Sequence, residues 1–492
     1  MKKSHSVSLL IFLVFVVVTL TGTLCHEMWR DELQVWLLTR NSHSLAELLH
    51  NTRYEGHPIL WHILVYPFSH MGNNMLWMSF LNLVIAWAFF YLLAFYSPFN
   101  PLQKILTALG YFLVFEYTVL ARNYAIEILL LFILCILYAR ERKNWLVIAG
   151  VLWLLCQTNI FGVFFALGFT ALFLSAMYGK TGNRQLLGLL LILFSGLALA
   201  AFQVIPPADT GYSVGWHFTY LPNFFKAFTT VFKSYVPIPE PVYGFWNSHL
   251  IMDKTTKLLL TLVFLGIISL RFMKKRDLLA FFWICNMMVW IFFYSKHYGT
   301  IRHHGHVYII FLICLWLEPY VPIRPLGIRR LEKVNINPVF NAFVVVIFGI
   351  QAAVGSYAIF RDCRDPFSQS KRAAEYIRAN HLDRYTIVGD KDFVAMPLSA
   401  FLEKPIFYPS RMEFGTYVKW DNKRRYSAPL SEVLSSTRKL ATDRQQDILL
   451  VTDYPLDIEK FRFLRKIATF ETAIVDDEVY FIYIADHKKI RI

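Results

Sequence analysis

The stretch SVSLLIFLVFVVVTLTGTLCHEMWRDE, residues 6–32, decides the fold of this chain. Its first part, residues 6–25, has no charged side chain, whereas residues 26–32 contain one cation and three carboxylates. An uncharged apolar run of about 20 residues is long enough to cross a bilayer as a helix. It is also longer than the apolar region of a secretory signal peptide, about 7–15 residues. We therefore interpret residues 6–25 as a retained membrane anchor that delivers a cluster of carboxylates to a membrane surface.

The composition indicates that the chain crosses the membrane many times. Of its 492 residues, 56% are hydrophobic and only 17% are charged, whereas a soluble protein carries about 25% charged residues. Apolar runs of roughly 17 to 22 residues recur up to residue 360, which predicts a polytopic α-helical membrane protein with about 11 transmembrane helices. We place these helices at residues 6–25, 75–97, 105–121, 124–139, 145–158, 160–178, 186–206, 257–272, 278–295, 307–322 and 338–360.

The net charge of +15 does not indicate a nucleic-acid partner, because of where the basic residues lie. They fall mostly in short loops between apolar runs, which is the pattern of cytoplasmic loops. With Lys2 and Lys3 in the cytoplasm, every such loop falls on the cytoplasmic side. The loops contain Lys104, Arg140, Arg142, Lys143, Lys180, Arg184, Arg271, Lys274, Lys275, Arg276, Arg324, Arg329, Arg330 and Lys333. We expect a multi-pass protein of a plasma (inner) membrane, with a cytoplasmic N-terminus, membrane lipids as partners and no nucleic acid.

The same alternation places the unusual polar segments on the extracytoplasmic side. The piece PILWHILVYPFSH, residues 58–70, is too short to cross, so we expect an interfacial or re-entrant helix within a first external loop, residues 26–74. The external segments are HEMWRDE (26–32), YEGHP (54–58), ARNYA (121–125), CQTN (156–159), the aromatic loop 207–256 and KHYGTIRHHGH (296–306). The sequence therefore predicts a site on the outer face. The aromatic loop itself is either an interfacial belt or a wall for a substrate.

After residue 360 the composition changes to that of a small α/β domain. Long apolar runs end, and PFSQSKRAAEYIRANH (366–381) has the character of a helix begun by a Pro/Ser cap. The segments expected to be strands are 385–389, 447–454, 466–475 and 478–486, the last two joined at Asp476 and Asp477. We expect a transmembrane catalytic unit at 1–360 and an extracytoplasmic α/β domain at 361–492.

Asp31 and Glu32 are the first candidates for catalysis. Carboxylates at a membrane surface beside tryptophans are partly desolvated, which keeps a base reactive. The alternative is structural: they cap the first external helix or pair with Arg30. The same loop returns with Glu55 and His57 directly before the short helix, so two acidic motifs bracket one amphipathic segment.

Arg122 and Arg302 are candidates for binding an anion. Arg122, with Tyr124 beside it, lies between two apolar helices that contain Glu116 and Glu127. An arginine fork suits a phosphate, and a glutamate would hold the guanidinium in place. The alternative is a structural pair of Arg122 with Glu127 or with Glu116.

The segment RHHGH holds Arg302, His303, His304 and His306, and it could bind an anion or a metal. Its histidines are too close in sequence to share one helical face. Zinc would therefore need a further ligand, such as Glu55, His57 or His217. A snorkelling loop at the membrane interface is the third possibility.

The order of "WRDE", "EGHP" and "ARNYA" resembles the GT-C membrane glycosyltransferases. The likeness is to their family 39-like branch, with the protein O-mannosyltransferases and the lipid A aminoarabinose transferase. It implies a polyprenyl-phosphate-linked sugar donor, with Asp31 as base and Glu32 as its companion. It also implies that Glu55 and His57 shape the site and that Arg122 binds the lipid phosphate.

These observations predict an inverting glycosyltransferase that acts on a hydroxyl of a lipid, glycan or protein acceptor on the outer face. Its substrate-binding residues would be Glu55, His57, Arg122, Tyr124, Glu127, Arg302 and His303. No cofactor is required by this chemistry, and a divalent metal stays open. The competing functions are a transporter or flippase for lipid-linked glycans, with polar groups along a path through the bilayer, and a scaffold that displays the α/β domain.

Overall fold

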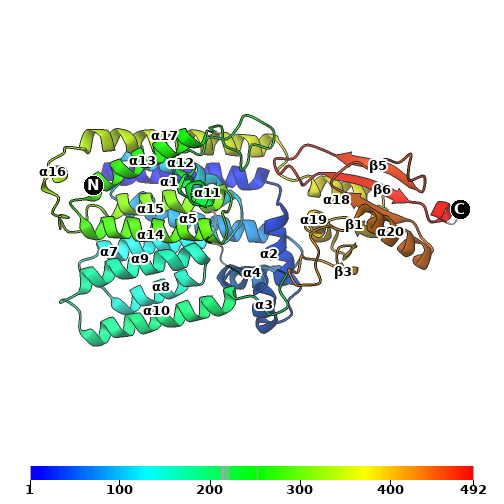
Figure 1. The fold of residues 1–492 in the computed structure, drawn as a ribbon, viewed down its shortest axis with the longest axis horizontal. Coiled ribbons are helices and arrows are strands. Elements are labelled where there is room, and N and C mark those ends of the chain that lie inside the picture. The colour runs from blue at the N-terminus through cyan, green and yellow to red at the C-terminus, as the bar shows by residue number, and fades with distance from the viewer. Residues whose placement is uncertain (1, 212–214, 216–217, 219–220, 252, 491–492) are drawn as a thin grey trace.

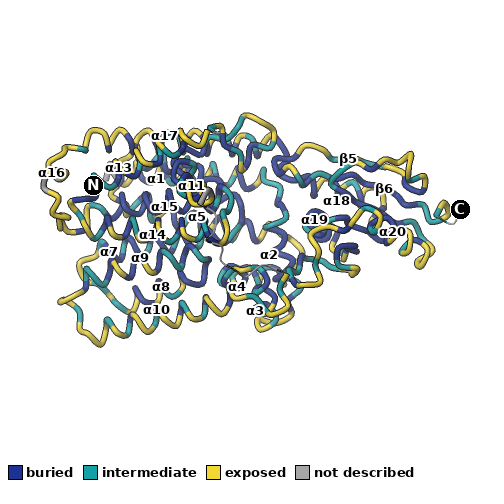
Figure 2. The backbone as a smooth tube through the Cα atoms, viewed as in Figure 1, coloured by how far each residue is buried: buried dark blue, intermediate teal, exposed yellow. Residues whose placement is uncertain are grey.

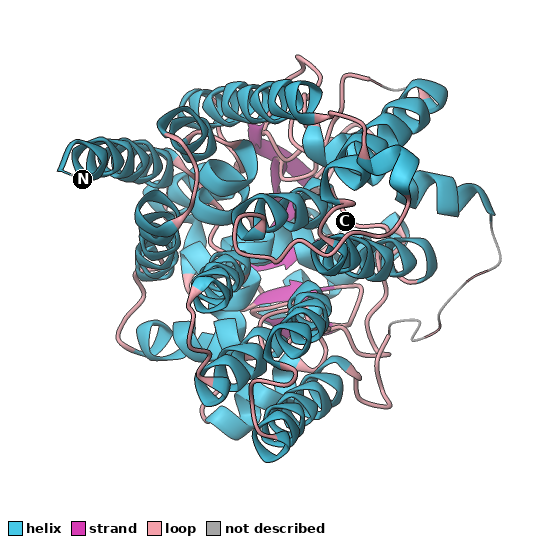
Figure 3. Ribbon diagram, turned by 90° about the vertical axis from the view of Figure 1, so that its left-hand side faces the viewer, coloured by secondary structure: helices cyan, strands magenta, loops and turns pink. Residues whose placement is uncertain are grey.

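The structure is a computed structural model that describes residues 2–211, 215, 218, 221–251 and 253–490. A long helical bundle lies beside a smaller domain that contains a β-sheet (Figure 1). Viewed along the bundle, the helices stand in front of the sheet (Figure 3). His217, one of the possible zinc ligands, lies outside the described residues, as does part of the aromatic loop.

Seven helices of the described chain are long and apolar enough to cross a membrane. They are α1 (Lys2–Cys25), α5 (Leu76–Tyr96), α9 (Ile160–Met177), α10 (Asn183–Val204), α13 (Lys254–Phe272), α14 (Arg276–Ser295) and α17 (Asn337–Arg364). Their outward faces are apolar and exposed, as in Leu191 (60% exposed) and Phe194 (69%), which suits contact with lipid (Figure 2). The chain is therefore a multi-pass membrane protein, as predicted.

The other four expected spans are also helical, but shorter. Three are α7 (Tyr124–Ala139), α8 (Trp145–Cys156) and α15 (Ile301–Leu317). The expected span 105–121 is divided into α6 (Pro101–Ala108) and a π-helix, η1 (Phe112–Val119). The break lies against α17, where a side chain at Gly355 would clash with the carbonyl oxygen of Leu109.

Two predicted boundaries are wrong. The span expected at 307–322 begins at Ile301 and ends at Leu317, so RHHGH belongs to α15 rather than to a loop. The last long helix continues to Arg364, past the boundary expected at residue 360. Both errors have one cause: the charged first or last turn of a buried helix does not look apolar in the sequence.

The first external loop forms three short helices at the end of the bundle next to the sheet domain (Figure 1). They are α2 (Arg30–Arg40), α3 (Leu45–Thr52) and α4 (Leu60–His70). With 11 residues, α4 is too short to span a bilayer, as predicted. Two more short helices, α11 (Leu221–Phe228) and α12 (Thr230–Tyr235), follow α10, and α16 (Arg329–Glu332) lies at the opposite end.

The C-terminal domain contains a six-stranded mixed sheet in the order β3-β2-β1-β4-β6-β5. Its strands are β1 (Thr386–Gly389), β2 (Ile406–Tyr408), β3 (Glu413–Gly415), β4 (Ile448–Thr452), β5 (Leu464–Phe470) and β6 (Tyr480–Ala485). Its helices are α18 (Ser370–Ala379), η2 (Leu382–Arg384), α19 (Asp392–Leu402), α20 (Leu430–Arg444) and α21 (His487–Ile490). The four predicted strands are present, although the third ends at Phe470 rather than at residue 475.

Helices cover both faces of this sheet because its strands alternate their side chains. Ile387 and Leu449 pack on one face, in the core that α18 and α19 close. Val388 and Leu450 point to the other face, in the core that α20 closes. A period of two with both faces apolar is typical of strands buried between helical layers. The expected α/β domain is thus confirmed.

Candidate active site

Helix α2 begins shortly after the end of α1 and carries Asp31 and Glu32 in its first turn. Adjacent residues of a helix point in different directions, and these two carboxylates have different surroundings. The side chain of Glu32 is 0% exposed, whereas that of Asp31 is 28% exposed. The pair predicted from the sequence is therefore one accessible and one inaccessible carboxylate.

Glu32 holds three segments together. Its Oε1 accepts a hydrogen bond from the backbone N–H of Ala121 (2.7 Å), and its Oε2 accepts one from that of Trp29 (3.2 Å). The same Oε2 lies 2.9 Å from Nε2 of His26, whose Nδ1 lies 2.9 Å from Asp362 of α17. Both oxygens of Glu32 are occupied, so its geometry is that of a cap and a positioning residue.

His26 is a positively charged bridge in this arrangement. Burial lowers the pKa of His26, but the neighbouring carboxylates of Asp362 and Glu32 raise it more, so that it stands well above the ordinary value. The bridge joins the end of α1 to the start of α2 and the end of α17. It fixes the position from which α2 presents Asp31.

Asp31 accepts from two arginines. Its Oδ2 lies 2.9 Å from Nη1 of Arg122 and 2.8 Å from Nη2 of Arg302. Burial raises the pKa of Asp31, but the two guanidinium groups lower it more, so the carboxyl group is ionised. The structure brings together three predicted residues from three distant segments. Arg122 is paired with Asp31, so the predicted alternatives of a pair with Glu116 or Glu127 are wrong.

Aromatic rings surround Arg302. Its guanidinium carbon lies 5.2 Å from the ring centre of Trp29 and 5.7 Å from that of Trp246. The indole of Trp246 donates to Glu116 (2.8 Å), which also accepts from Tyr111 (2.5 Å). Trp246 comes from the aromatic loop, so the described part of that loop contributes a wall. Cation–π contacts of this kind hold a guanidinium in place without neutralising it.

Glu55 and His57 lie near the same cluster, and burial disfavours the charged form of both. Glu55 accepts a hydrogen bond from Gln34 (2.7 Å), and burial raises its pKa to about 7. Burial, together with Arg122 and Arg302, lowers the pKa of His57 to about 3. The Nδ1 of His57 is buried and has no hydrogen-bond partner among the described residues. The site thus contains a neutral imidazole and a carboxyl group that titrates near neutral pH.

The histidines of RHHGH have structural partners. His303 accepts from the backbone N–H of Thr300 (2.9 Å), and His304 donates to the carbonyl of Tyr298 (3.0 Å). His306 lies 3.0 Å from Glu127, deep in the bundle. These contacts cap the first turn of α15 and hold this helix against α7. Of this segment, Arg302 is the residue that forms an ion pair with Asp31.

Glu127 and Tyr124 lie in the first turn of α7, which begins shortly after Arg122. The carboxylate of Glu127 is 0% exposed and also accepts from Asn159 (2.6 Å). The ring of Tyr124 lies 5.2 Å from that of Tyr117, and its hydroxyl is buried without a partner among the residues described. The Tyr124 hydroxyl lies close to Arg302, which acts on it electrostatically, whereas Glu127 supports the packing of α7, α9 and α15.

Among the described residues, no group of metal ligands lies beside Asp31. Over the described part of the chain, the one set of three side chains spaced to hold an ion is Asp447, Asp486 and His487. That set lies in the C-terminal domain and includes a direct contact of His487 with Asp447 (2.8 Å). Of the histidines proposed for zinc, those that the structure describes do not belong to such a set.

The C-terminal domain contacts α2 at two places, which the sequence did not predict. The Oε1 of Glu478 accepts from the backbone N–H of Arg30 (3.0 Å), and Asp477 pairs with the Arg30 guanidinium (2.7 Å). One turn later, Gln34 exchanges two hydrogen bonds with the backbone of Val418 (2.7 and 2.9 Å). The domain therefore holds the helix that carries Asp31 on both sides of that residue.

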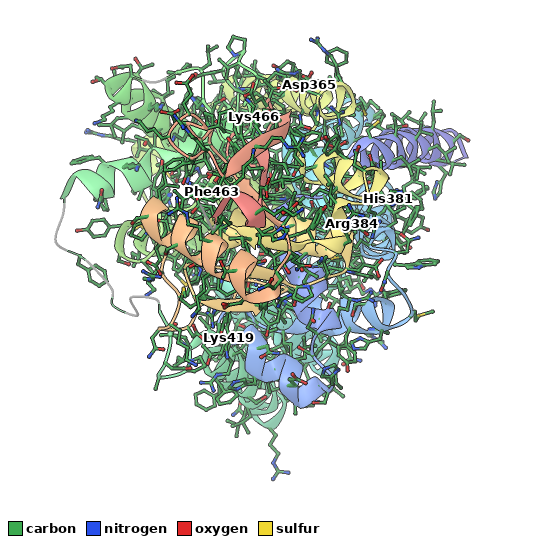
Figure 4. All side chains as sticks on the ribbon, turned by 90° about the vertical axis from the view of Figure 1, so that its right-hand side faces the viewer. Asp365, His381, Arg384, Lys419, Phe463 and Lys466 are labelled. Carbon is green, nitrogen blue, oxygen red and sulfur yellow. The ribbon has the colours of Figure 1, made fainter. Side chains whose placement is uncertain are left out.

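The loop after β3 also covers the first external loop. Lys419 lies 5.0 Å from the ring centre of Tyr54, and in Figure 4 its label stands next to the blue helices of that loop. In the sequence, the acidic residues 476–478 are the feature that could have indicated this contact between the C-terminal domain and α2. The sequence pattern instead predicts a turn there that joins two strands.

Comparison with known proteins identifies the fold. No family model matches the sequence, and no curated protein matches it. Among solved structures, ArnT from Cupriavidus metallidurans in the apo state matches with a TM-score of 0.51 and 11% identity, over 97% of this chain and 98% of that chain. The chain shares the fold of ArnT. The predicted architecture, a transmembrane bundle followed by a small α/β domain, thus agrees with the fold of ArnT over 97% of this chain.

Two further structures are similar at lower scores. ArnT bound to undecaprenyl phosphate matches with a TM-score of 0.48 and 12% identity, over 97% of each chain. The mycobacterial arabinofuranosyltransferase AftD matches with a TM-score of 0.36 and 10% identity, over 96% of this chain and 41% of that chain.

Proposed function

We propose that this chain is a GT-C type glycosyltransferase that moves a sugar from a polyprenyl-phosphate donor to a hydroxyl group of a lipid, glycan or protein. The observation that carries the proposal is that the carboxylate of Asp31 bridges Arg122 and Arg302 at the end of the bundle next to the C-terminal domain (Figure 1). A base and two phosphate-binding groups stand within direct contact of each other. The ArnT-like fold supports the same class of reaction.

The two arginines would bind the donor phosphate. Guanidinium groups bind phosphate through paired hydrogen bonds, and Arg122 and Arg302 lie together beside Asp31. In the structure they share one carboxylate oxygen, the Oδ2 of Asp31. A phosphate would compete with Asp31 for them, and their charge would stabilise the phosphate as it departs.

Asp31 would be the general base. The acceptor oxygen attacks the anomeric carbon of the sugar and transfers its proton to Asp31, while the bond from that carbon to the phosphate oxygen breaks. The products are the glycosylated acceptor and polyprenyl phosphate, and direct displacement inverts the anomeric carbon. Once a phosphate engages the arginines, Asp31 loses the contacts that depress its pKa and becomes a better proton acceptor.

Orientation follows from the two ends of the bundle. The basic loops expected in the cytoplasm connect helices at the end remote from the C-terminal domain (Figure 1). With those loops in the cytoplasm of a plasma (inner) membrane, the candidate active site and the C-terminal domain face outward. Transfer would then occur on the extracytoplasmic face.

The test is sugar transfer by the purified full chain in nanodiscs. Radiolabelled undecaprenyl-phosphate sugars are supplied one at a time, with total membrane lipid or glycan as acceptor. Wild type is compared with Asp31→Asn and with Asp457→Asn, whose carboxylate is 52% exposed. Label moved to an acceptor by wild type and Asp457→Asn, but not by Asp31→Asn, supports the proposal. No transfer from any donor, with lipid-linked sugar crossing the bilayer in sealed vesicles, would favour the flippase instead.

A further inference from the structure

A cavity of about 520 Å³ lies at the end of the bundle opposite the candidate active site. The end of α13, the turn into α14, the end of α15 and the segment that leads into α17 form its walls. This end also carries α16 at the far side from the C-terminal domain (Figure 1). The ionisable residues of its lining are Arg271, Lys274, Lys275, Lys333 and Glu318.

The cavity has more positive than negative charge. The carboxylate of Glu318 already has a cationic partner, because its Oε1 lies 2.7 Å from Nη2 of Arg271. Its backbone carbonyl accepts a hydrogen bond from Lys275. Within the described residues, no carboxylate lies within salt-bridge distance of Lys274, Lys275 or Lys333. These three lysines therefore line one space without a carboxylate partner among the described side chains.

An apolar rim surrounds this basic space. Of the lining residues, Ile323 is 72% exposed, and Leu331 and Val334 are each more than 40% exposed. Apolar side chains on a loop at the end of a membrane bundle are stable where lipid covers them. Below the rim, the guanidinium of Arg271 rests on the ring of Phe340 (5.2 Å), and its Nε is buried with no partner among the described residues. The cavity thus joins a basic floor to a lipid-facing edge.

We propose that this cavity binds the headgroup of an anionic phospholipid. Lys274, Lys275 and Lys333 would hold the phosphate, because an ammonium group binds phosphate as a compact charge without a required fork geometry. The acyl chains would lie along the apolar rim. The volume is in the range of sites that hold small molecules, and basic pockets between transmembrane helices bind phospholipid headgroups.

The proposal does not depend on the glycosyltransferase reaction, because no residue of the cavity belongs to the candidate active site. The competing explanation is that these lysines serve only to orient the chain in the membrane. Orientation requires positive charge anywhere on the loops of this face. A headgroup site requires it at this cavity, which gives a direct contrast between two sets of basic residues.

The first experiment compares two triple variants of the full chain in neutral detergent. In one, Lys274→Gln, Lys275→Gln and Lys333→Gln remove the cavity charges. In the other, Arg140→Gln, Arg142→Gln and Lys143→Gln remove the same charge from the loop between α7 and α8, which does not line the cavity. Retention of phosphatidylglycerol and phosphatidylcholine is measured by native mass spectrometry across a lipid titration.

Wild type and the loop variant should retain phosphatidylglycerol in preference to phosphatidylcholine. The cavity variant should lose about 100-fold in affinity for phosphatidylglycerol, since each lysine near an anionic surface contributes about fivefold. Equal losses in both variants would show general surface attraction and overturn the proposal. Inorganic phosphate forms the other arm: if it binds as tightly as the lipid and displaces it, the site is one for free phosphate.

A second measurement uses the wild-type chain alone, so it does not depend on how a variant folds. Phosphatidylglycerol with a photoreactive group on its headgroup is incorporated into nanodiscs, and crosslinked peptides are mapped. Crosslinks should concentrate in residues 331–337 and in the turn between α13 and α14, which line the cavity. Crosslinks spread evenly over the basic loops of this face would contradict a defined site.

Discussion

The two ends of the helical bundle treat charge in opposite ways. Next to the C-terminal domain, Asp31 accepts from Arg122 and Arg302, whose side chains are only 11% and 12% exposed. At the other end, Lys274 and Lys333 are exposed, and Glu318 is the single carboxylate of their cavity. Removing charges from water is expensive, so a buried set joined by direct ion pairs indicates chemistry that needs fixed positions. The exposed set indicates contact with lipid and solvent.

The same contrast exists between two neighbours in the sequence. Glu32 is enclosed and uses both oxygens to hold backbone and His26, whereas Asp31 remains partly accessible and holds only side chains. Rigid support next to a reactive group is the arrangement that catalysis by preorganised charges requires. Substitutions at the two ends of the bundle, or at Asp31 and at Glu32, should therefore have distinguishable effects.

The largest expected effect is that of Asp31→Asn. An amide of the same shape cannot accept the acceptor proton, so transfer should fall by about 10²–10⁴-fold. Arg140→Gln, at the opposite end, should transfer sugar at the wild-type rate. The measurement is initial rate of transfer in nanodiscs, with size-exclusion profiles to show that each variant is folded. Full activity of Asp31→Asn would remove this residue from catalysis.

A smaller effect is expected from Asp362→Asn, and it should appear in stability. His26 would keep Glu32 but lose one of its two carboxylates, and breaking a buried pair destabilises a protein by about 3–5 kcal/mol. Because the pKa of His26 is raised in the folded chain, its stabilisation is fully present below the ordinary pKa and lost as pH rises through the folded value. The difference from wild type in thermal unfolding should therefore narrow at high pH.

An exposed carboxylate provides the matched control for this stability test. Asp457→Asn should leave thermal unfolding unchanged at every pH, since this side chain is 52% exposed. A loss of stability in Asp362→Asn that is the same at low and high pH would mean that packing, rather than the charge of His26, holds α1, α2 and α17 together.

Next in size are the conservative variants Arg122→Lys and Arg302→Lys. Lysine keeps the positive charge but loses the guanidinium fork, and at position 302 it also loses the stacking on Trp29 and Trp246. The expected loss in kcat/KM for the lipid-linked donor is about 10²-fold for each. Undecaprenyl phosphate, a polyprenyl phosphate of the kind released in the proposed reaction, is the probe for binding. Wild-type affinity in both variants would show that the arginines only shape Asp31.

The sequence predicted the parts of this contrast that are local. Runs of apolar residues place the helices, and the positions of lysine and arginine separate the two ends, because both properties are independent of how helices pack. Convergence of HEMWRDE, YEGHP, ARNYA and Arg302 at one end followed from that alternation. The fold match to ArnT confirms the architecture.

What the sequence missed depends on packing or on very short elements. The sequence does not show whether Arg122 pairs with Asp31 or with Glu116, because the partner depends on how the helices are rotated about their axes. The strands β2 and β3 have three residues each, too few to show a period of two. The contact of Glu478 with Arg30 crosses from one unit to the other, so no local pattern records it.

The smallest effect concerns pH and separates Glu55 from Asp31. The pKa of Glu55 is about 7 in the folded chain against an ordinary value of 4.5, so the folded chain keeps this proton in a window where the unfolded chain has lost it. Stability should therefore fall as pH rises from about 4.5 to about 7. Glu55→Gln removes this titration, so its thermal unfolding should depend less on pH than that of wild type.

The same variant decides which carboxyl group accepts the proton. If Asp31 is the base, Glu55→Gln should keep most of its activity at every pH. If Glu55 is the base, wild-type activity should rise with pH through about 7, where its proton leaves, and Glu55→Gln should lose that activity altogether. Asp31 would then serve to hold the two arginines, and the base would come from the YEGHP motif at the other side of the first external loop.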